Sequence, residues 1–193
     1  MDNIGKILHY LAKTGDMFTL HELSKLTGIP YATFYRTVKK MGKLVNIISK
    51  GQSKLITLNW NELTRAHLVL ASGEQEREAL KKNPLLKQLD EKAKGIVLIF
   101  GSYANNTQTN KSDVDVMVIN ENGKKTIKFR DLELLYDKEI NPIFFSKEEF
   151  VAMLQDKEEN VAKQALKNHI LLSGFENFWK LVENGTRSIQ TKI

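Results

Sequence analysis

Two short groups of residues, Gly101-Ser102 and Asp113-Val114-Asp115, have the types and spacing suited to phosphate and metal chemistry. Successive side chains of a strand point to opposite faces, so Asp113 and Asp115 are expected on one face, roughly 6.6 Å apart. Two such carboxylates repel each other unless a cation neutralises them, and oxygen ligands select a hard ion such as magnesium. Gly101 lets a backbone approach an anion closely, and Ser102 offers a hydroxyl and an N–H. Together these residues predict a site for a metal ion and a nucleotide.

Two apolar runs are expected to position these groups. Residues 95–100 (GIVLIF) precede Gly101, and residues 114–119 (VDVMVI) follow Asp113. Each run is rich in Val and Ile and bounded by turn-forming residues, which predicts a buried strand. The intervening residues 103–112 form a polar loop, where Lys111 is either a phosphate contact or a solvated lysine. The plainer alternative, a surface turn with two solvated aspartates, does not explain why both acids share one face of an apolar strand.

The strand, Gly-Ser, loop and Asp-x-Asp strand resemble the signature of the polymerase-β-like nucleotidyltransferases, most closely the minimal bacterial and archaeal type. The resemblance covers roughly the last half of the chain. It implies that Gly101 and Ser102 hold a nucleoside triphosphate such as ATP, and that Asp113 and Asp115 are catalytic ligands of Mg²⁺ or Mn²⁺. It also implies in-line attack of an acceptor on the α-phosphorus, with pyrophosphate leaving.

One position departs from the pattern of that family. These enzymes place a third carboxylate on a later strand, and the next candidate strand, residues 139–145 (EINPIFF), has Asn141 there. An amide oxygen ligates a cation without adding negative charge, which predicts weaker binding of a second divalent ion. Glu139, on the same face, is the alternative ligand if the register shifts, because Pro142 suits an edge strand or a bulge. Catalysis, and nucleotide binding without turnover, therefore both stay open.

Composition limits the classes of protein that fit. A chain of 193 residues suits one large domain or two small ones. The absence of cysteine excludes disulfides, thiolate metal ligands and cysteine nucleophiles. The N-terminus has no long apolar run, so we expect no signal peptide, no membrane span and a cytoplasmic location.

The charge of the chain is concentrated in its first third. Residues 1–60 hold nine of the 29 Lys and Arg but three of the 23 Asp and Glu, a net charge of +6, whereas the remaining 20 and 20 cancel. Such asymmetry predicts a polyanion-binding module joined to a neutral one.

Periodicity in residues 1–60 predicts three helices followed by a β-hairpin. Thr19 and Glu22 have the spacing of a capping box at the start of the second helix. This order resembles a winged helix-turn-helix domain, and residues 21–41 (HELSKLTGIPYATFYRTVKKM) carry the resemblance. The expected bounds are residues 4–14, 20–26 and 31–44 for the helices and 45–49 and 54–58 for the strands.

The winged-helix resemblance implies that residues 31–44 form a recognition helix on duplex DNA. It assigns contacts in the major groove to Tyr31, Thr33, Arg36 and Thr37, phosphate contacts to Lys39, Lys40 and Lys43, and wing contacts to Lys50 and Lys54. The alternative is a module for protein contacts or dimerisation with a solvated basic face. A homodimer on two half-sites is a further expectation.

The sequence as a whole predicts an α/β (α+β) protein with a winged helix-turn-helix at residues 1–60, a helical connector at 61–94 and a nucleotidyltransferase domain at 95–193. That domain is expected to have a mixed sheet flanked by helices, including helices at 126–138, 161–172 and 175–182. Our leading hypothesis is a DNA-associated nucleotidyltransferase that acts on a hydroxyl acceptor, with a protein among the candidates. The alternative is a transcriptional regulator whose transferase-like domain binds nucleotide or a partner protein without turnover.

Overall fold

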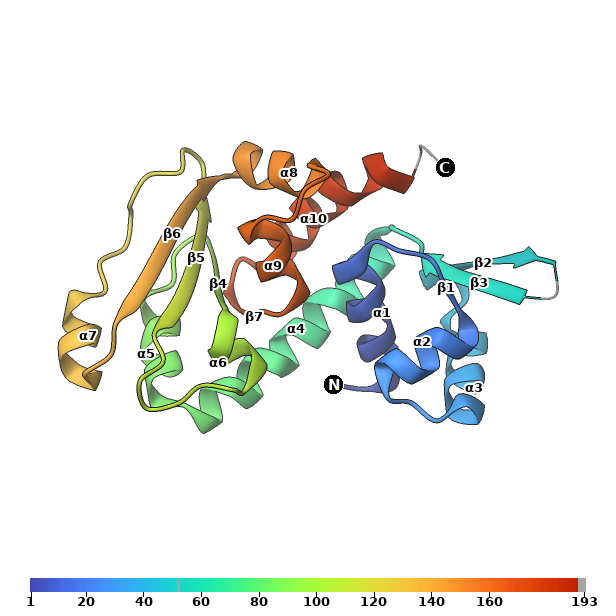
Figure 1. Ribbon diagram of the computed structural model, residues 1–193, viewed down its shortest axis with the longest axis horizontal. Helices are drawn as coiled ribbons and strands as arrows, with labels where there is room; N and C mark the ends of the chain where they lie inside the picture. Colours follow the sequence, from blue (N-terminus) through green and yellow to red (C-terminus); the bar gives the residue numbers. More distant parts are fainter. Residues whose placement is uncertain (52, 191–193) are drawn as a thin grey trace. The chain divides into compact units, whose positions relative to one another are not determined.

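The computed structural model describes residues 1–51 and 53–190, except for the side chains of residues 187–190. The chain forms two compact units, one containing Met1–Ala71 and the other Ser72–Ser188 (Figure 1). The division falls within helix α4 (Glu62–Lys82). Gln52, at the predicted hairpin tip, and residues 191–193, at the end of the predicted transferase domain, lie outside the described residues.

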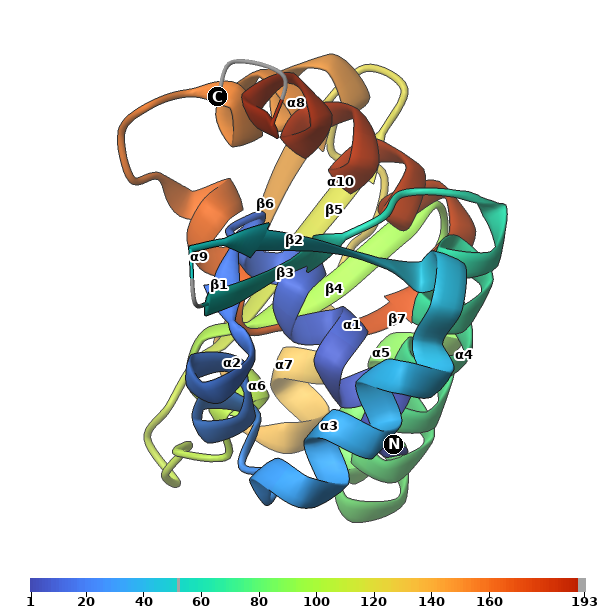
Figure 2. The ribbon, with the colours of Figure 1, turned by 90° about the vertical axis from the view of Figure 1, so that its right-hand side faces the viewer.

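The first unit contains three helices followed by a β-hairpin, in the order that the sequence predicted (Figure 2). The short strand β1 pairs antiparallel with the second hairpin strand, so the sheet order is β1-β3-β2. The elements are α1 (Asn3–Thr14), β1 (Phe18–Thr19), α2 (Leu20–Thr27), α3 (Tyr31–Met41), a 3₁₀ turn (Gly42–Leu44), β2 (Val45–Lys50) and β3 (Ser53–Leu58).

Local signals in the sequence account for these helices. The predicted capping box is confirmed, because Thr19 Oγ1 accepts from Glu22 N at 3.2 Å and Glu22 Oε2 accepts from Thr19 N at 2.8 Å. The apolar stripe of α3, formed by Phe34, Val38 and Met41, is buried. This stripe closes a core with the fully buried residues Ile7, Leu8, Leu11, Leu23 and Ile56.

The second unit is built on a four-stranded mixed sheet, as the sequence predicted. Its order is β6-β5-β4-β7, in which β5 and β6 are parallel and the other pairs antiparallel. The strands are β4 (Ile96–Phe100), β5 (Val114–Asn120), β6 (Ile140–Ser146) and β7 (Ile170–Ser173).

Helices cover both faces of this sheet. Leu86 of α5 (Pro84–Lys92) and Leu132 of α7 (Arg130–Tyr136) belong to the core cluster that contains Val116 and Val118 of β5. On the other face, α8 (Lys147–Gln155) contacts β5 and β6, and α9 (Val161–Lys167) contacts β4. Helix α10 (Phe175–Gln190) packs on α8 through Phe178 and Phe150, whose ring centroids lie 5.9 Å apart. Side chains alternate along β5, so Asp115 points away from the face covered by α5 and α7.

The helix predicted at residues 161–172 was wrong in its second half. Helix α9 ends at Lys167, and Ile170–Ser173 forms β7, which pairs antiparallel with β4. An apolar run of this length fits either a helix or a strand by pattern alone. The backbone groups along the open edge of β4 need partners, and β7 supplies them.

The helix predicted at residues 126–138 is shorter than expected. Helix α7 covers only Arg130–Tyr136, while Ile127 and Phe129 precede it in irregular backbone and are nevertheless buried. Ile127 is one of the apolar residues on which the prediction of a longer helix rested, and its burial without helical backbone explains the error.

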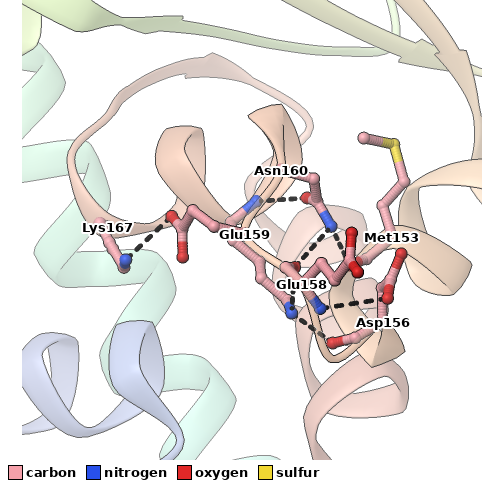
Figure 3. Close-up of polar contacts among 7 residues, drawn as sticks. Met153, Asp156, Glu158, Glu159, Asn160 and Lys167 are labelled. Carbon is pink, nitrogen blue, oxygen red and sulfur yellow. Dashed lines mark hydrogen bonds and ion pairs between the residues drawn. The ribbon is translucent and has the colours of Figure 1, made fainter.

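Polar contacts fix the connection between α8 and α9 (Figure 3). Asn160 caps α9 by accepting from Lys163 N at 3.1 Å, and its Nδ2 donates to Met153 O of α8 at 2.7 Å. Lys163 Nζ donates to the backbone carbonyls of Glu158 (2.8 Å) and Asp156. Lys167 pairs with Glu159 at 2.9 Å. These bonds fix α8 and α9 relative to each other, on the sheet face toward which Asp115 points.

Among the described residues, no helix combines the length and the apolar character that crossing a membrane requires.

His9 of α1 lies in the core of the first unit with 4% of its surface exposed. The pKa of His9 is lowered from 6.5 to about 3, mainly by burial and also by the nearby charge of Lys13, while a hydrogen bond with the Leu68 backbone acts in the opposite direction. In the unfolded chain the His9 imidazole therefore becomes protonated near pH 6.5, whereas in the folded unit it stays neutral down to about pH 3.

We predict that the first unit loses stability as the pH falls from 6.5 towards 3, with about 2 kcal/mol attributable to His9 at pH 5. Amide hydrogen exchange in α1, measured at pH 7 and pH 5, reports this unit separately. His9→Leu should remove that share of the pH dependence, and His67→Leu should keep it. Equal dependence in the wild type and His9→Leu would contradict the assignment.

Candidate nucleotide and metal site

Gly101 lies where β4 meets the short helix α6 (Gly101–Asn105), directly beside Asp115. The last residue of β4, Phe100, pairs with Asp115 in the antiparallel register of β4 and β5. Gly101 has a φ of +67°, and a Cβ there would overlap Oδ2 of Asp115. Its left-handed backbone conformation favours glycine, and any Cβ there would force the Asp115 carboxylate to move.

The predicted metal ligands Asp113, Asp115 and Asn141 come together at one edge of the sheet. Asp115 is paired with Asn141 in the parallel register of β5 and β6, so their side chains share a face. Asp113 precedes β5, and its Oδ2 lies 3.5 Å from Asn141 Nδ2. The register of β5 and β6 thus places Asn141 beside the two aspartates, as expected.

Glu139 does not complete a carboxylate cluster with the aspartates. It is exposed just before β6, and its backbone carbonyl accepts from Val114 N at 2.9 Å. Within residues 1–51 and 53–190, no group of three His, Cys, Asp or Glu side chains is placed to hold a metal ion. The geometry therefore offers two carboxylates and one amide.

The electrostatics of the site reflect the closeness of the two aspartates. Partial burial raises the pKa of the Asp115 carboxyl, and the charge of Asp113 raises it further. Burial also raises the pKa of the Tyr103 phenol, with the charge of Asp113 adding to the effect. A set of oxygen donors with two negative charges fits a hard divalent ion such as Mg²⁺, which usually keeps several waters or phosphate oxygens as further ligands.

The two other residues predicted to bind nucleotide lie on the segment between β4 and β5. Ser102 is partly exposed in α6, and its carbonyl accepts from Thr107 N at 3.0 Å. Lys111 is exposed, and its backbone N–H donates to Thr109 Oγ1 at 3.3 Å. No described contact joins the Lys111 side chain to the aspartates, so its role stays a prediction.

Two residues near the site were missed by the sequence analysis. Tyr103 is buried in α6 and responds electrostatically to Asp113. Lys138 Nζ donates to the carbonyl of Asn110, in the loop that carries Lys111. The position of Tyr103 next to Ser102 could have indicated that Tyr103 lies near the site. The contact of Lys138 depends on the path of the loop between Ser102 and Asp113, which the sequence does not reveal.

The residues predicted to bind DNA form a separate surface on the first unit. The cationic side chains are exposed, whereas Thr33 and Thr37 are half-buried. Two predicted base-reading groups donate within their own helix: Arg36 Nε to Ala32 O at 3.3 Å and Thr37 Oγ1 to Thr33 O at 2.9 Å. The full set is Tyr31, Thr33, Arg36, Thr37, Lys39, Lys40, Lys43, Lys50 and Lys54.

Comparison with known proteins supports the assignment of the second unit. A family model described as "Polymerase beta, Nucleotidyltransferase" matches residues 83–176, which include Gly101-Ser102, both aspartates and Asn141. The match supports a polymerase-β-like nucleotidyltransferase domain in this part of the chain, with nucleotidyl transfer as its general function. No curated protein and no solved structure matches the chain.

We predict that Gly101→Ala impairs metal binding because the added methyl group displaces the Asp115 carboxylate. Mn²⁺ binding, measured by electron paramagnetic resonance, should weaken by about 10-fold or more. Gly28→Ala is the matched control, because Gly28 has a similar φ of +66° but open space around it. Both variants should lose about 1 kcal/mol or more of stability through backbone strain. Unchanged Mn²⁺ affinity in folded Gly101→Ala would contradict the proposed role of the glycine.

Proposed function

We propose that the chain is a metal-dependent nucleotidyltransferase that transfers a nucleoside monophosphate from a triphosphate, such as ATP, to a hydroxyl acceptor. The observation that carries this proposal is the pairing of Asp113 and Asp115 beside Gly101, inside the segment that matches the transferase family. Carboxylates held together in this way are suited to a divalent ion and, through it, to a polyphosphate.

Each residue of the site has a role in this proposal. Asp113 and Asp115 hold Mg²⁺, or Mn²⁺ in its place, and Asn141 contributes an amide oxygen. Gly101 and Ser102 bind the triphosphate. Lys111, in the loop that leads to Asp113, is a further phosphate contact. The metal ion neutralises charge on the phosphate oxygens. Glu139 has no role in this proposal, because the register of β5 and β6 pairs Asn141 with Asp115.

The reaction forms one bond and breaks another. The acceptor hydroxyl oxygen bonds to the α-phosphorus, and the bond between the α-phosphorus and the α,β-bridging oxygen breaks. Pyrophosphate leaves with that bridging oxygen, and the hydroxyl proton passes to solvent. The acceptor itself is open, with a protein among the candidates.

We predict transfer of label from α-³²P-ATP to a macromolecule or small molecule of a cell extract in the presence of Mg²⁺. Loss of a residue that only supports a metal ligand reduces activity by up to roughly 100-fold. Asp115 is a proposed direct ligand, so Asp115→Asn should reduce transfer by more than that. Asp137→Asn is the control, because Asp137 lies outside the site and asparagine tolerates its φ of +49°. Label transfer that Asp115→Asn leaves intact would exclude the proposed chemistry.

A second candidate function is favoured by Asn141, since the site offers two carboxylates where the family pattern has three. In this version the domain binds a nucleotide or a partner protein without turnover, and the chain acts as a transcriptional regulator. Calorimetry and the label-transfer assay together distinguish the two functions. Saturable ATP binding with Mg²⁺ by calorimetry would favour the regulator if the wild type transfers no label and Asn141→Asp gains transfer. Absence of ATP binding would exclude a nucleotide-sensing role.

The basic surface of the first unit supports a further part of the proposal, association with duplex DNA. We predict that affinity falls steeply with salt and that replacing Lys39 and Lys40 together by Ala lowers the slope of log K against log salt by about 2. Replacement of Lys124 and Lys125, an adjacent exposed pair in the second unit, is the matched control and should leave the slope unchanged. Fluorescence anisotropy with the full chain measures both, and equal slopes in all three proteins would count against DNA contact at this surface.

A further inference from the structure

An open groove of about 490 Å³ lies on the first unit. Its lining comes from three elements: Thr19–His21 at the start of α2, Tyr31 and Tyr35 of α3, and Ser53-Lys54 of β3. The volume is in the range of small-molecule sites. Figure 2 shows the three contributing elements from one side.

Aromatic rings are the distinctive feature of this groove. Tyr31 and Tyr35 stack with their ring centroids 6.2 Å apart and an interplanar angle of 29°, and His21 contacts Tyr31 edge-on at 5.7 Å. Tyr31 is 47% exposed, so it contributes little to the core. Rings that are stacked and yet open to solvent form a platform on which a further flat group can stack.

The charges around the platform are positive. Lys39 Nζ lies 4.7 Å from the centroid of the Tyr35 ring, and Lys54 lines the groove. Glu22 is the acidic residue nearest in sequence to the α2 part of the lining, and its carboxylate is engaged with Thr19 in the capping box. The surroundings therefore complement a flat group that carries phosphates.

Sequence-specific reading of a duplex is less well supported at this surface. Arg36 Nε and Thr37 Oγ1 both donate to carbonyls of their own helix. In a duplex both faces of each internal base are covered by neighbouring bases, so such a base cannot stack on Tyr31. An unpaired base exposes a face, and stacking on an aromatic ring tolerates any base.

We propose that this groove binds an unpaired nucleobase of a single-stranded nucleic acid segment, which stacks on the Tyr31–Tyr35 pair. Lys39 and Lys54 neutralise the adjacent phosphates. This inference rests on the proposed binding of nucleic acid by the first unit, and it adds a preference for single strands, gaps or frayed ends over a fully paired duplex.

The test compares three ligands of equal length by fluorescence anisotropy with the full chain: a single-stranded oligonucleotide, its duplex, and a strand in which the central bases are replaced by abasic units. The single strand should bind more tightly than the abasic strand, by about 5-fold to 100-fold. Tyr31→Ala should weaken single-strand binding by a similar factor, and should weaken duplex binding clearly less. Tyr31→Phe should retain the affinity, because the ring is kept.

Leu26→Ala is the control, because Leu26 is similarly exposed (50%) and does not line the groove. Circular dichroism checks that the variants fold. Duplex binding with no single-strand binding, or equal effects of Tyr31→Ala on both ligands, would overturn the inference and leave the proposed duplex association standing. Single-strand binding without duplex binding would support the stacking groove and exclude the duplex association. Absence of binding to any of the ligands would overturn both the stacking groove and the duplex association.

Discussion

The repulsion between the carboxylates of Asp113 and Asp115 is the constraint on which the proposed function depends. The fold holds these side chains at one edge of the sheet because β5 is buried on both faces and its register with β6 is fixed. Partial burial raises the pKa of the Asp115 carboxyl and the charge of Asp113 raises it further, so both effects follow from that placement. Gly101 keeps the adjacent space free of a side chain. A divalent ion relieves the repulsion, and the same ion brings a polyphosphate to the site.

The two units separate two kinds of electrostatic surface. Residues 1–60 carry the whole net charge of +6, and the remainder of the chain is balanced. A basic surface with exposed aromatic rings is suited to a polyanion with flat groups, whereas a site with two carboxylates is suited to a cation. The proposed functions therefore assign nucleic acid to the first unit and a metal-bound nucleotide to the second.

Much of this arrangement was predictable from the sequence, because it depends on short-range patterns. Continuous apolar runs predicted β4 and β5, and the resemblance to the nucleotidyltransferases, whose third carboxylate aligns with Asn141, predicted that Asn141 lies with the aspartates. Strand β7 was missed because a short apolar run does not reveal that an open sheet edge needs a partner. The donation of Arg36 and Thr37 to their own helix was also missed, because it depends on side-chain conformations that the residue types leave free. Tyr103 was missed because its link to Asp113 arises only when α6 folds against β5.

The most direct test of the account is the anomalous diffraction of crystals of the protein soaked in manganese, with and without ATP. We predict a manganese peak within ligand distance of the Asp113 and Asp115 carboxylates, and its loss when Asp115 is replaced by Asn. Well-diffracting wild-type crystals with no anomalous density beside these two carboxylates, in either soak, would contradict the claim that their repulsion creates a cation site.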